Sequence, residues 1–169
     1  KNFDFLFISA PENVAWLLNI RGNDNPNSPL PNCHLFLDNK KNFYLFADRK
    51  KTQALIKEKK INQNQIFDFE NFNLFVNTFK EGKVLIDKKT CSVFNENILR
   101  QKLKIIKGDD PIYMLKAIKN STELSNMINT HIIDGIALTK FLYWIKNVNK
   151  KEISEFEAQN KLEKFRKKN

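Results

Sequence analysis

Four residues of this sequence have side chains that often bind zinc or act as nucleophiles. They are the cysteines Cys33 and Cys91 and the histidines His34 and His131. Their spacing matches neither CxxC nor another common ligand pattern, and Cys33 and His34 are neighbours in an expected strand, where consecutive side chains point to opposite faces. Nucleophile motifs, HExxH and phosphate-binding glycine loops are also missing from the sequence. We therefore predict no catalytic residue and no metal site in these 169 residues.

A polar loop is the second feature that could carry function. Residues 23–32 are rich in asparagine, aspartate and proline, which favour turns, and the loop is long enough to be functional. The candidate site residues are Arg21, just before this loop, and Asn23, Asp24 and Asn25 at its start. Arg21 could contact a ligand from here, or it could hold the loop through hydrogen bonds to backbone carbonyls or to Asp24.

The adjacent carboxylates Asp109 and Asp110 are a third candidate, because paired carboxylates can bind metal ions. They stand in a Gly-Asp-Asp-Pro turn, however, and such a position is typical of an exposed helix cap. We predict that both carboxylates are solvated.

Short apolar segments between turn residues predict the elements that position these side chains. Phe3, Phe5 and Phe7 alternate with other residues, which predicts a strand with one buried face. Residues 33–37 and 42–46 predict a β-hairpin. Further strands are expected at residues 66–69, 83–87 and 103–107. One helix is expected to begin at Pro11 and a second one after Asp48, which would cap it. Two more helices are expected at residues 71–79 and 92–102. This alternation predicts an α/β fold with some parallel pairing.

The pattern after residue 110 is helical. Asn120 with Glu123, and Ser154 with Glu157, stand at capping-box spacing and predict two helix starts. Apolar residues then repeat at three and four as far as Val148, which predicts a first helix about 40 Å long at ~1.5 Å per residue. Residues 121–169 therefore predict a helical hairpin whose apolar side chains need a further partner surface.

Composition and charge limit the class of protein. With 41% hydrophobic residues the chain can bury a core of its own. The net charge of +10 suggests a nucleic acid or an anionic membrane as partner, but the excess is divided evenly between residues 1–110 and 111–169. We predict a lysine-rich solvated surface, with no nucleic acid and no membrane as partners.

Two cysteines are too few for a fold built on disulfides, which favours a reducing compartment, and we expect the cytoplasm. No stretch approaches the ~18–20 apolar residues of a membrane span, so we expect a soluble protein. The first residue is not Met, and we expect an excised part of a longer chain.

Two segments carry a specific pattern. Residues 11–31 read PENVAWLLNIRGNDNPNSPLP, and residues 112–166 contain KAIKN, then a helical segment, then LEKFR. The first resembles the segment xxIAWLxNxRGxDxxxNP in the middle domain of three-domain Xaa-Pro aminopeptidases. The second resembles KAxKNxxExxGMRxAHxRDxxALxxFxxWLE and TEIsaadkLExFR of that family. Residues 49–107 match only in the order of strands and helices.

The resemblance implies a creatinase N-terminal-domain-like mixed sheet flanked by helices, followed by a helical hairpin from the start of a pita-bread domain. It divides the chain into a middle domain at 1–110, a linker at 111–120 and the first helices of the catalytic domain at 121–169. The family removes the N-terminal residue from peptides with proline second, using two divalent metal ions, usually manganese. Its metal ligands follow the LEKFR helix, so the resemblance implies no bound cofactor and no peptidase activity in these residues alone.

The resemblance also implies partners and a role for the loop. The partners would be peptides with proline second, through the catalytic domain, and a second copy in a homodimer. Residues 21–32 would project toward a catalytic domain and help to wall off the peptide entrance. The alternative is a stand-alone basic module that binds an acidic protein or nucleic acid. The aromatic residues stand at core positions, however, and this argues against nucleic-acid binding.

Overall fold

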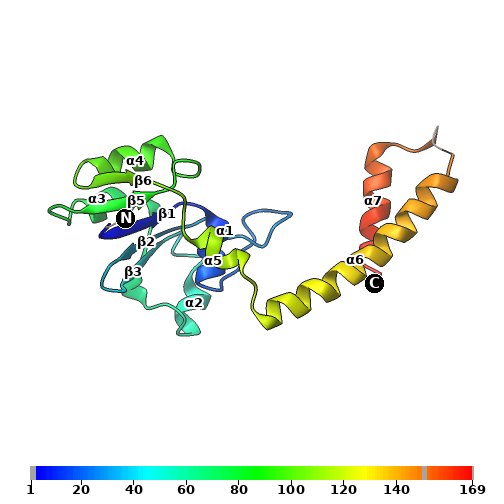
Figure 1. The fold of residues 1–169 in the computed structure, drawn as a ribbon, viewed down its shortest axis with the longest axis horizontal. Coiled ribbons are helices and arrows are strands. Elements are labelled where there is room, and N and C mark those ends of the chain that lie inside the picture. The colour runs from blue at the N-terminus through cyan, green and yellow to red at the C-terminus, as the bar shows by residue number, and fades with distance from the viewer. Residues whose placement is uncertain (1–2, 150–151, 169) are drawn as a thin grey trace. The chain divides into compact units, whose positions relative to one another are not determined.

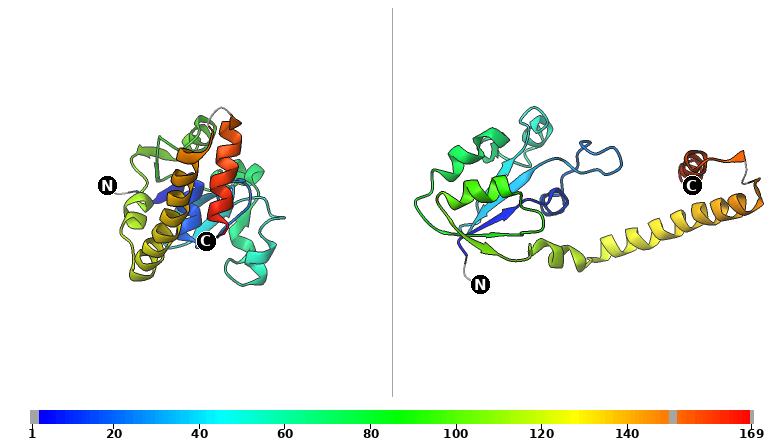
Figure 2. Two further views of the ribbon diagram at one scale, coloured as in Figure 1. Left: turned by 90° about the vertical axis from the view of Figure 1, so that its right-hand side faces the viewer. Right: turned by 90° about the horizontal axis from the view of Figure 1, so that it is seen from above.

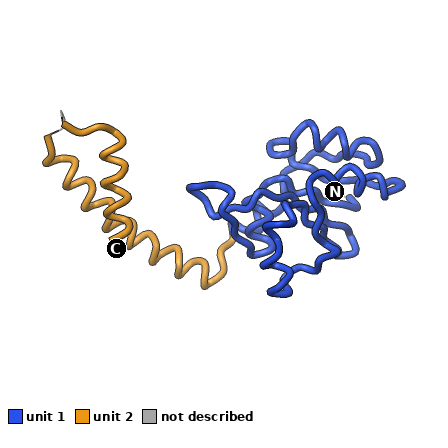
Figure 3. The backbone as a smooth tube through the Cα atoms, turned by 180° about the vertical axis from the view of Figure 1, so that it is seen from behind, with its two compact units in different colours: residues 1–117 blue, residues 118–169 orange. Residues whose placement is uncertain are grey.

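The computed structural model describes residues 3–149 and 152–168. The chain forms two compact units, residues 1–117 (unit 1) and residues 118–169 (unit 2), coloured separately in Figure 3. Unit 1 is a layered α/β domain and unit 2 is a pair of helices (Figure 1).

Unit 1 is built on a six-stranded mixed sheet with the strand order β4-β3-β2-β1-β5-β6. The pairs β1–β2 and β2–β3 are antiparallel, and the pairs β1–β5, β5–β6 and β3–β4 are parallel. The strands are β1 (Phe5–Ile8), β2 (His34–Asp38), β3 (Phe43–Phe46), β4 (Ile66–Phe67), β5 (Lys83–Ile86) and β6 (Lys104–Lys107). The predicted hairpin, the α/β class and the partly parallel pairing are confirmed.

Helices cover both faces of this sheet (Figures 1 and 2). Two of them, with one 3₁₀ turn, lie on the first face: η2 (Phe69–Asn71), α3 (Phe72–Val76) and α4 (Val93–Arg100). On the second face lie α1 (Pro11–Leu17), α2 (Gln53–Lys57) and α5 (Ile112–Ala117), and η1 (Gln63–Gln65) precedes β4. Helix α5 falls within the range 111–120 and packs against α1.

Strand β1 is buried on both faces. Phe7 packs in the core under α3 and α4, while Ile8 packs in the core under α1 and α5. In register, Phe7 faces Phe36 of β2 on one side and Ile86 of β5 on the other. The prediction of a single buried face was wrong, because an interior strand of a sheet with helices on both sides has no solvated face.

The core under α3 and α4 is a cluster of aromatic rings. The ring centroids of Phe7 and Phe72 lie 5.0 Å apart, and those of Phe46 and Phe72 lie 4.9 Å apart. Such pairs contribute about 0.5–1.5 kcal/mol each beyond the area they bury. The cluster also includes Phe5, Phe36, Tyr44, Phe67, Phe75 and Phe79.

Two predicted helices are shorter than expected. Asp48 does not cap α2, since its Oδ1 accepts a hydrogen bond from the backbone N–H of Lys50 and forms a turn, and α2 begins only at Gln53. The helix predicted at 71–79 is α3, which ends at Val76. Aspartate and asparagine side chains offer the backbone local hydrogen bonds that compete with helix formation.

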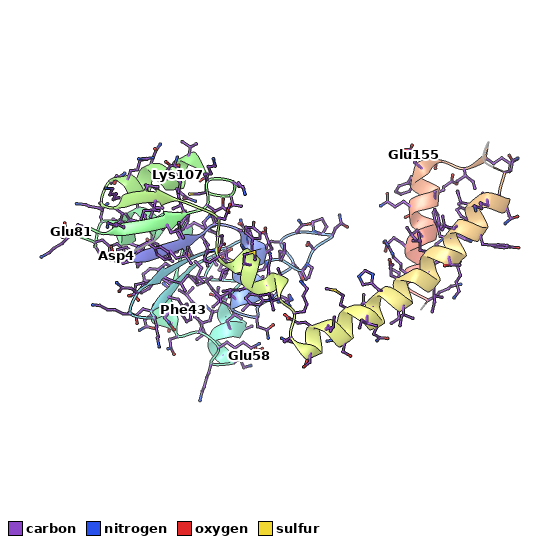
Figure 4. All side chains as sticks on the ribbon, viewed as in Figure 1. Asp4, Phe43, Glu58, Glu81, Lys107 and Glu155 are labelled. Carbon is purple, nitrogen blue, oxygen red and sulfur yellow. The ribbon has the colours of Figure 1, made fainter. Side chains whose placement is uncertain are left out.

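Charged side chains such as those of Glu58 and Glu81 lie on the outside of unit 1 (Figure 4). Lys107 of β6 is paired across to α4, where its Nζ lies 3.0 Å from Oε1 of Glu96. The same carboxylate pairs with Arg100. These exposed ion pairs add little to stability, typically below about 1 kcal/mol each.

Unit 2 consists of α6 (Ser121–Asn147) and α7 (Glu155–Arg166), which pack on each other as the predicted hairpin. Both predicted capping boxes are present, with Asn120 Oδ1 accepting from the N–H of Glu123 at 2.8 Å. Arg166 Nε donates to Asp134 Oδ1 at 2.7 Å and joins the two helices. Across the described residues, no helix combines the length and apolarity needed to cross a bilayer.

We predict that Leu99→Ala lowers the free energy of unfolding of unit 1 by about 2–5 kcal/mol, because Leu99 is fully buried. Leu74→Ala, the same change at a side chain that is 69% exposed, should alter it by less than about 0.5 kcal/mol. Urea unfolding followed by Trp16 fluorescence in a Trp144→Phe background reports unit 1 alone. Equal effects of the two substitutions would contradict the core assignment.

Candidate functional site

The loop of residues 21–32 is held in one shape by its own hydrogen bonds. The backbone N–H of Gly22 donates to the carbonyl of Pro29 at 3.2 Å. Asp24 Oδ2 accepts from the N–H of Asn32 at 2.8 Å. The two ends of the loop are therefore tied together.

Arg21 is anchored to the end of α1. Its Nη1 donates to the carbonyl of Ile20 at 2.8 Å and to that of Ala15 at 3.3 Å. The side chain is nevertheless exposed, and it lies among the residues that line a pocket. These two hydrogen bonds fix the orientation of the guanidinium group, which stays on the surface of unit 1.

The other three predicted residues are exposed. Asp24 forms an ion pair with Lys51, and this contact, with the N–H of Asn32, lowers the pKa of the Asp24 carboxyl. Asn25 Oδ1 accepts from the N–H of Asn27 at 3.2 Å, which forms a local turn. The ion pair fastens the loop to the segment that precedes α2.

A pocket of about 430 Å³ lies beside the loop, between it, the end of β3 and α2. Three predicted site residues line it, Arg21, Asn23 and Asp24, while Asn25 lines an adjacent pocket that shares Asp24. The apolar side of the first pocket is formed by Ile20, Leu45, Ala47 and Leu55. The structure thus brings three of the four predicted residues to one cavity.

Gly22 allows the two ends of the loop to approach each other beside this pocket. A Cβ atom at that position would lie 2.6 Å from the Cα of Pro31, closer than real Cβ contacts come. The loop can take this path only because residue 22 has no side chain.

A second polar cluster, which the sequence patterns did not predict, lies at the carboxyl ends of β1 and β5. After β1 the chain continues into α1 on one face of the sheet, and after β5 it continues into α4 on the opposite face. Where two neighbouring parallel strands connect to opposite faces in this way, α/β sheets commonly bind ligands. Here the position is occupied by the domain's own side chains. Ser9 Oγ and Thr90 Oγ1, for example, are 2.8 Å apart.

Asp110 lies at the centre of this cluster and is 3% exposed. Its Oδ2 accepts from Asn13 Nδ2 at 2.7 Å and its Oδ1 accepts from the N–H of Ile112 at 2.9 Å. The N–H of Asp110 donates to Asp87 Oδ2 at 3.2 Å. The prediction of a solvated cap was therefore wrong for Asp110, although Asp109 is exposed and pairs with Lys89. A signal was present in Asn13, a polar residue next to the apolar positions of α1.

His34 lies in the aromatic core, with ring centroids 5.5 Å from Phe7 and 5.3 Å from Phe69. Among the described residues its buried Nδ1 has no hydrogen-bond partner, while Nε2 lies 3.4 Å from Asn95 Nδ2. Burial lowers the pKa of His34, since the ring is desolvated. His131, in contrast, is exposed on α6.

The cysteines do not provide a reactive thiol. Burial raises the pKa of Cys33 to about 12 and that of Cys91 to about 11, so both are protonated at neutral pH. Cys33 and His34 pack on opposite faces of the sheet, as their neighbouring positions predict. Within residues 3–149 and 152–168, no three His, Cys, Asp or Glu side chains group so that they could hold a metal ion, and these residues do not fit a two-metal centre.

Known proteins share the sequence pattern and the architecture of this chain. The family model described as "Creatinase/Prolidase N-terminal domain" matches residues 1–123. The chain belongs to the creatinase/prolidase N-terminal domain family. This membership confirms the resemblance of residues 11–31, and the model ends at residue 123, near the start of the second segment, 112–166.

Curated relatives of this chain include Xaa-Pro aminopeptidases. It is 34% identical to Xaa-Pro aminopeptidase ApepP of Drosophila melanogaster over 173 residues, covering 98% of this chain and 28% of the relative. It is 31% identical to Xaa-Pro aminopeptidase 1 of Dictyostelium discoideum, covering 98% of this chain and 27% of that protein. The chain therefore spans less than a third of the length of these relatives.

Solved structures share the creatinase/prolidase fold. The Xaa-Pro dipeptidase from Bacillus anthracis matches with a TM-score of 0.71 at 16% identity, over 98% of this chain and 44% of that one. The prolidase from Pyrococcus furiosus matches with a TM-score of 0.67 at 21% identity, over 98% and 45%. At these identities the likeness concerns the fold.

The partly buried His34 predicts that unit 1 loses stability in mild acid. The unfolded chain takes up a proton near pH 6.5 but the folded chain only at lower pH, so stability is full above 6.5 and falls below it. The loss between pH 6.5 and about pH 5.5 is at most about 1.4 kcal/mol. In urea titrations, His34→Gln should make the free energy of unfolding depend less on pH in this range, and His131→Gln should leave that dependence unchanged. A slope that survives His34→Gln would contradict this assignment.

We predict that Gly22→Ala opens the loop, because the new methyl group overlaps Pro31. Proteolysis and hydrogen exchange within residues 23–32 should both become faster. Gly135→Ala on α6 is the matched control, since its Cβ would meet nothing within 4 Å, and alanine should stabilise that helix by about 1 kcal/mol. Unchanged protection of the loop in Gly22→Ala would show that Pro31 moves aside.

Proposed function

We propose that this chain is the non-catalytic part of a longer, metal-dependent Xaa-Pro aminopeptidase. In full length the enzyme would hydrolyse the N-terminal residue from peptides with proline in second position. The observation that carries this proposal is the match to Xaa-Pro aminopeptidases at up to 34% identity over 98% of the chain. The match includes both units.

In this proposal residues 1–110 are the middle domain, 111–120 the linker and 121–169 the first helices of the catalytic domain. Unit 2 supports the last assignment, because its helices pack on each other and still expose apolar side chains such as Ile128 and Ile132, at 55% and 58%. The rest of a catalytic domain would cover such a surface. The two divalent metal ions, manganese in our proposal, belong to the part of the enzyme outside these residues.

The loop of residues 21–32 is the part of unit 1 that we assign to substrate access. It is exposed, its shape is fixed by hydrogen bonds and by the Asp24–Lys51 ion pair, and it borders a pocket. A loop with these properties can line the entrance to a catalytic domain of its own or of a partner copy in a homodimer, without losing order when the peptide leaves. The cytoplasm remains our expected location.

The full-length protein, loaded with manganese, should release the first residue from Xaa-Pro peptides and not from matched Xaa-Ala peptides. Release followed by mass spectrometry measures this selectivity. Equal cleavage of both peptide sets, or no cleavage of either, would contradict the proposal.

In the same enzyme, Arg21→Ala should raise KM for longer peptides and leave kcat for the shortest substrate near the wild-type value, since the loop would contact only the distal part of a peptide. Leu74→Ala, an exposed change on α3, is the control. Unchanged kinetics together with a lower melting temperature would instead assign Arg21 solely to holding the end of α1.

A further inference from the structure

Helix α1 is fastened to α5 by side chains of its first turn. Asn13 donates from Nδ2 to Asp110 Oδ2 at 2.7 Å and accepts at Oδ1 from Lys116 Nζ at 2.5 Å. Next to it, Glu12 Oε1 accepts from the hydroxyl of Tyr113 at 3.2 Å. Helix α5 is the last element of unit 1 before the chain continues at Ile118.

The other end of α1 carries the loop. Arg21 donates to the carbonyls of Ala15 and Ile20, and the N–H of Ile20 bonds to the carbonyl of Ala15 at 3.0 Å. Helix α1, seven residues long, therefore connects the loop of residues 21–32 to α5, after which the chain leaves unit 1. Motion of one end of so short and rigid an element is transmitted to the other.

The link between α1 and α5 has a single geometry. Asn13 is fully buried and Asp110 nearly so. The two oxygens of Asp110 and the amide oxygen and nitrogen of Asn13 all have partners, so the pair cannot rearrange without leaving a buried polar atom unsatisfied.

We propose that Asn13 and Asp110 are positioning residues: their buried hydrogen bond holds the loop of residues 21–32 and the chain leaving unit 1 in one fixed arrangement. The consequence for substrate binding rests on the proposed function. The mechanical link itself concerns unit 1 alone and is tested separately.

Exchanging the asparagine and the aspartate between positions 13 and 110 tests the link between α1 and α5. Asn13→Asp places two buried carboxylates against each other and should break it, while Asp110→Asn removes the charge and is the milder change. In the double variant Asn13→Asp/Asp110→Asn, the amide of residue 110 donates to the carboxylate of residue 13 and still accepts from the N–H of Ile112. Asn95→Asp is the matched control, because Asn95 is a buried asparagine on α4, outside this cluster.

Hydrogen exchange on the full-length protein is the first measurement. Asn13→Asp should make the amides of α5 and those of Gly22 and Asn32 exchange at least about tenfold faster, and the double variant should restore protection. Asn95→Asp should affect α4 only. Faster exchange in α5 with an unchanged loop, or no restoration in the double variant, overturns the proposal. Should Asn13→Asp fail to fold, Asp110→Asn against the double variant gives the same comparison.

Peptidase kinetics are the second measurement. Asn13→Asp should raise KM for long Xaa-Pro peptides by about threefold or more, with kcat changed less than about twofold, and the double variant should reverse the change. A merely destabilising substitution such as Asn95→Asp should not produce this split. An inactive wild-type enzyme contradicts the proposed function while the exchange experiment still decides the link. An active enzyme with unchanged KM overturns the positioning role.

Discussion

The pairing of β1 with β2 on one side and with β5 on the other is the constraint on which unit 1 depends. The first pair is antiparallel and lies next to the β2–β3 hairpin, and the second is parallel, which requires a crossover connection. Because β1 is an interior strand of a sheet with helices on both faces, its residues face a core on each side, and Phe7 and Ile8 are both buried. The aromatic cluster and the α1–α5 layer form around this one strand.

The same junction explains why the domain's polar chemistry is internal. The carboxyl ends of β1 and β5 are where an α/β sheet usually offers a ligand site. In this domain Asp87, Asp110 and Asn13 occupy that place and bond to one another directly or through the backbone. Strand ends closed in this way suit a domain that positions a loop and the point where the chain leaves unit 1. The loop of residues 21–32 is an exposed polar segment next to a pocket.

Local patterns predicted those elements whose signals lie within a few residues. The capping boxes at Asn120 and Ser154 are present because the side chain and the N–H that it bonds are three residues apart. Three predicted site residues, Arg21, Asn23 and Asp24, line one pocket, and their role in substrate access stays a prediction. Predictions failed where a distant partner decided the outcome, as for the second buried face of β1 at Ile8 and for Asp110, which bonds to a helix almost a hundred residues earlier in the chain.

By itself the sequence determined the class of fold, the family, the helix starts of unit 2 and the position of the polar loop, because these depend on residue periodicity, turn chemistry and ordered motifs. Only the tertiary structure decided which polar residues are buried and which are solvated. Asp109 and Asp110 are neighbours of identical chemistry, yet one pairs with Lys89 at the surface and the other is enclosed with Asn13. The difference comes from long-range packing of α1 against α5, and desolvation, unlike periodicity, has no signature in the neighbouring residues.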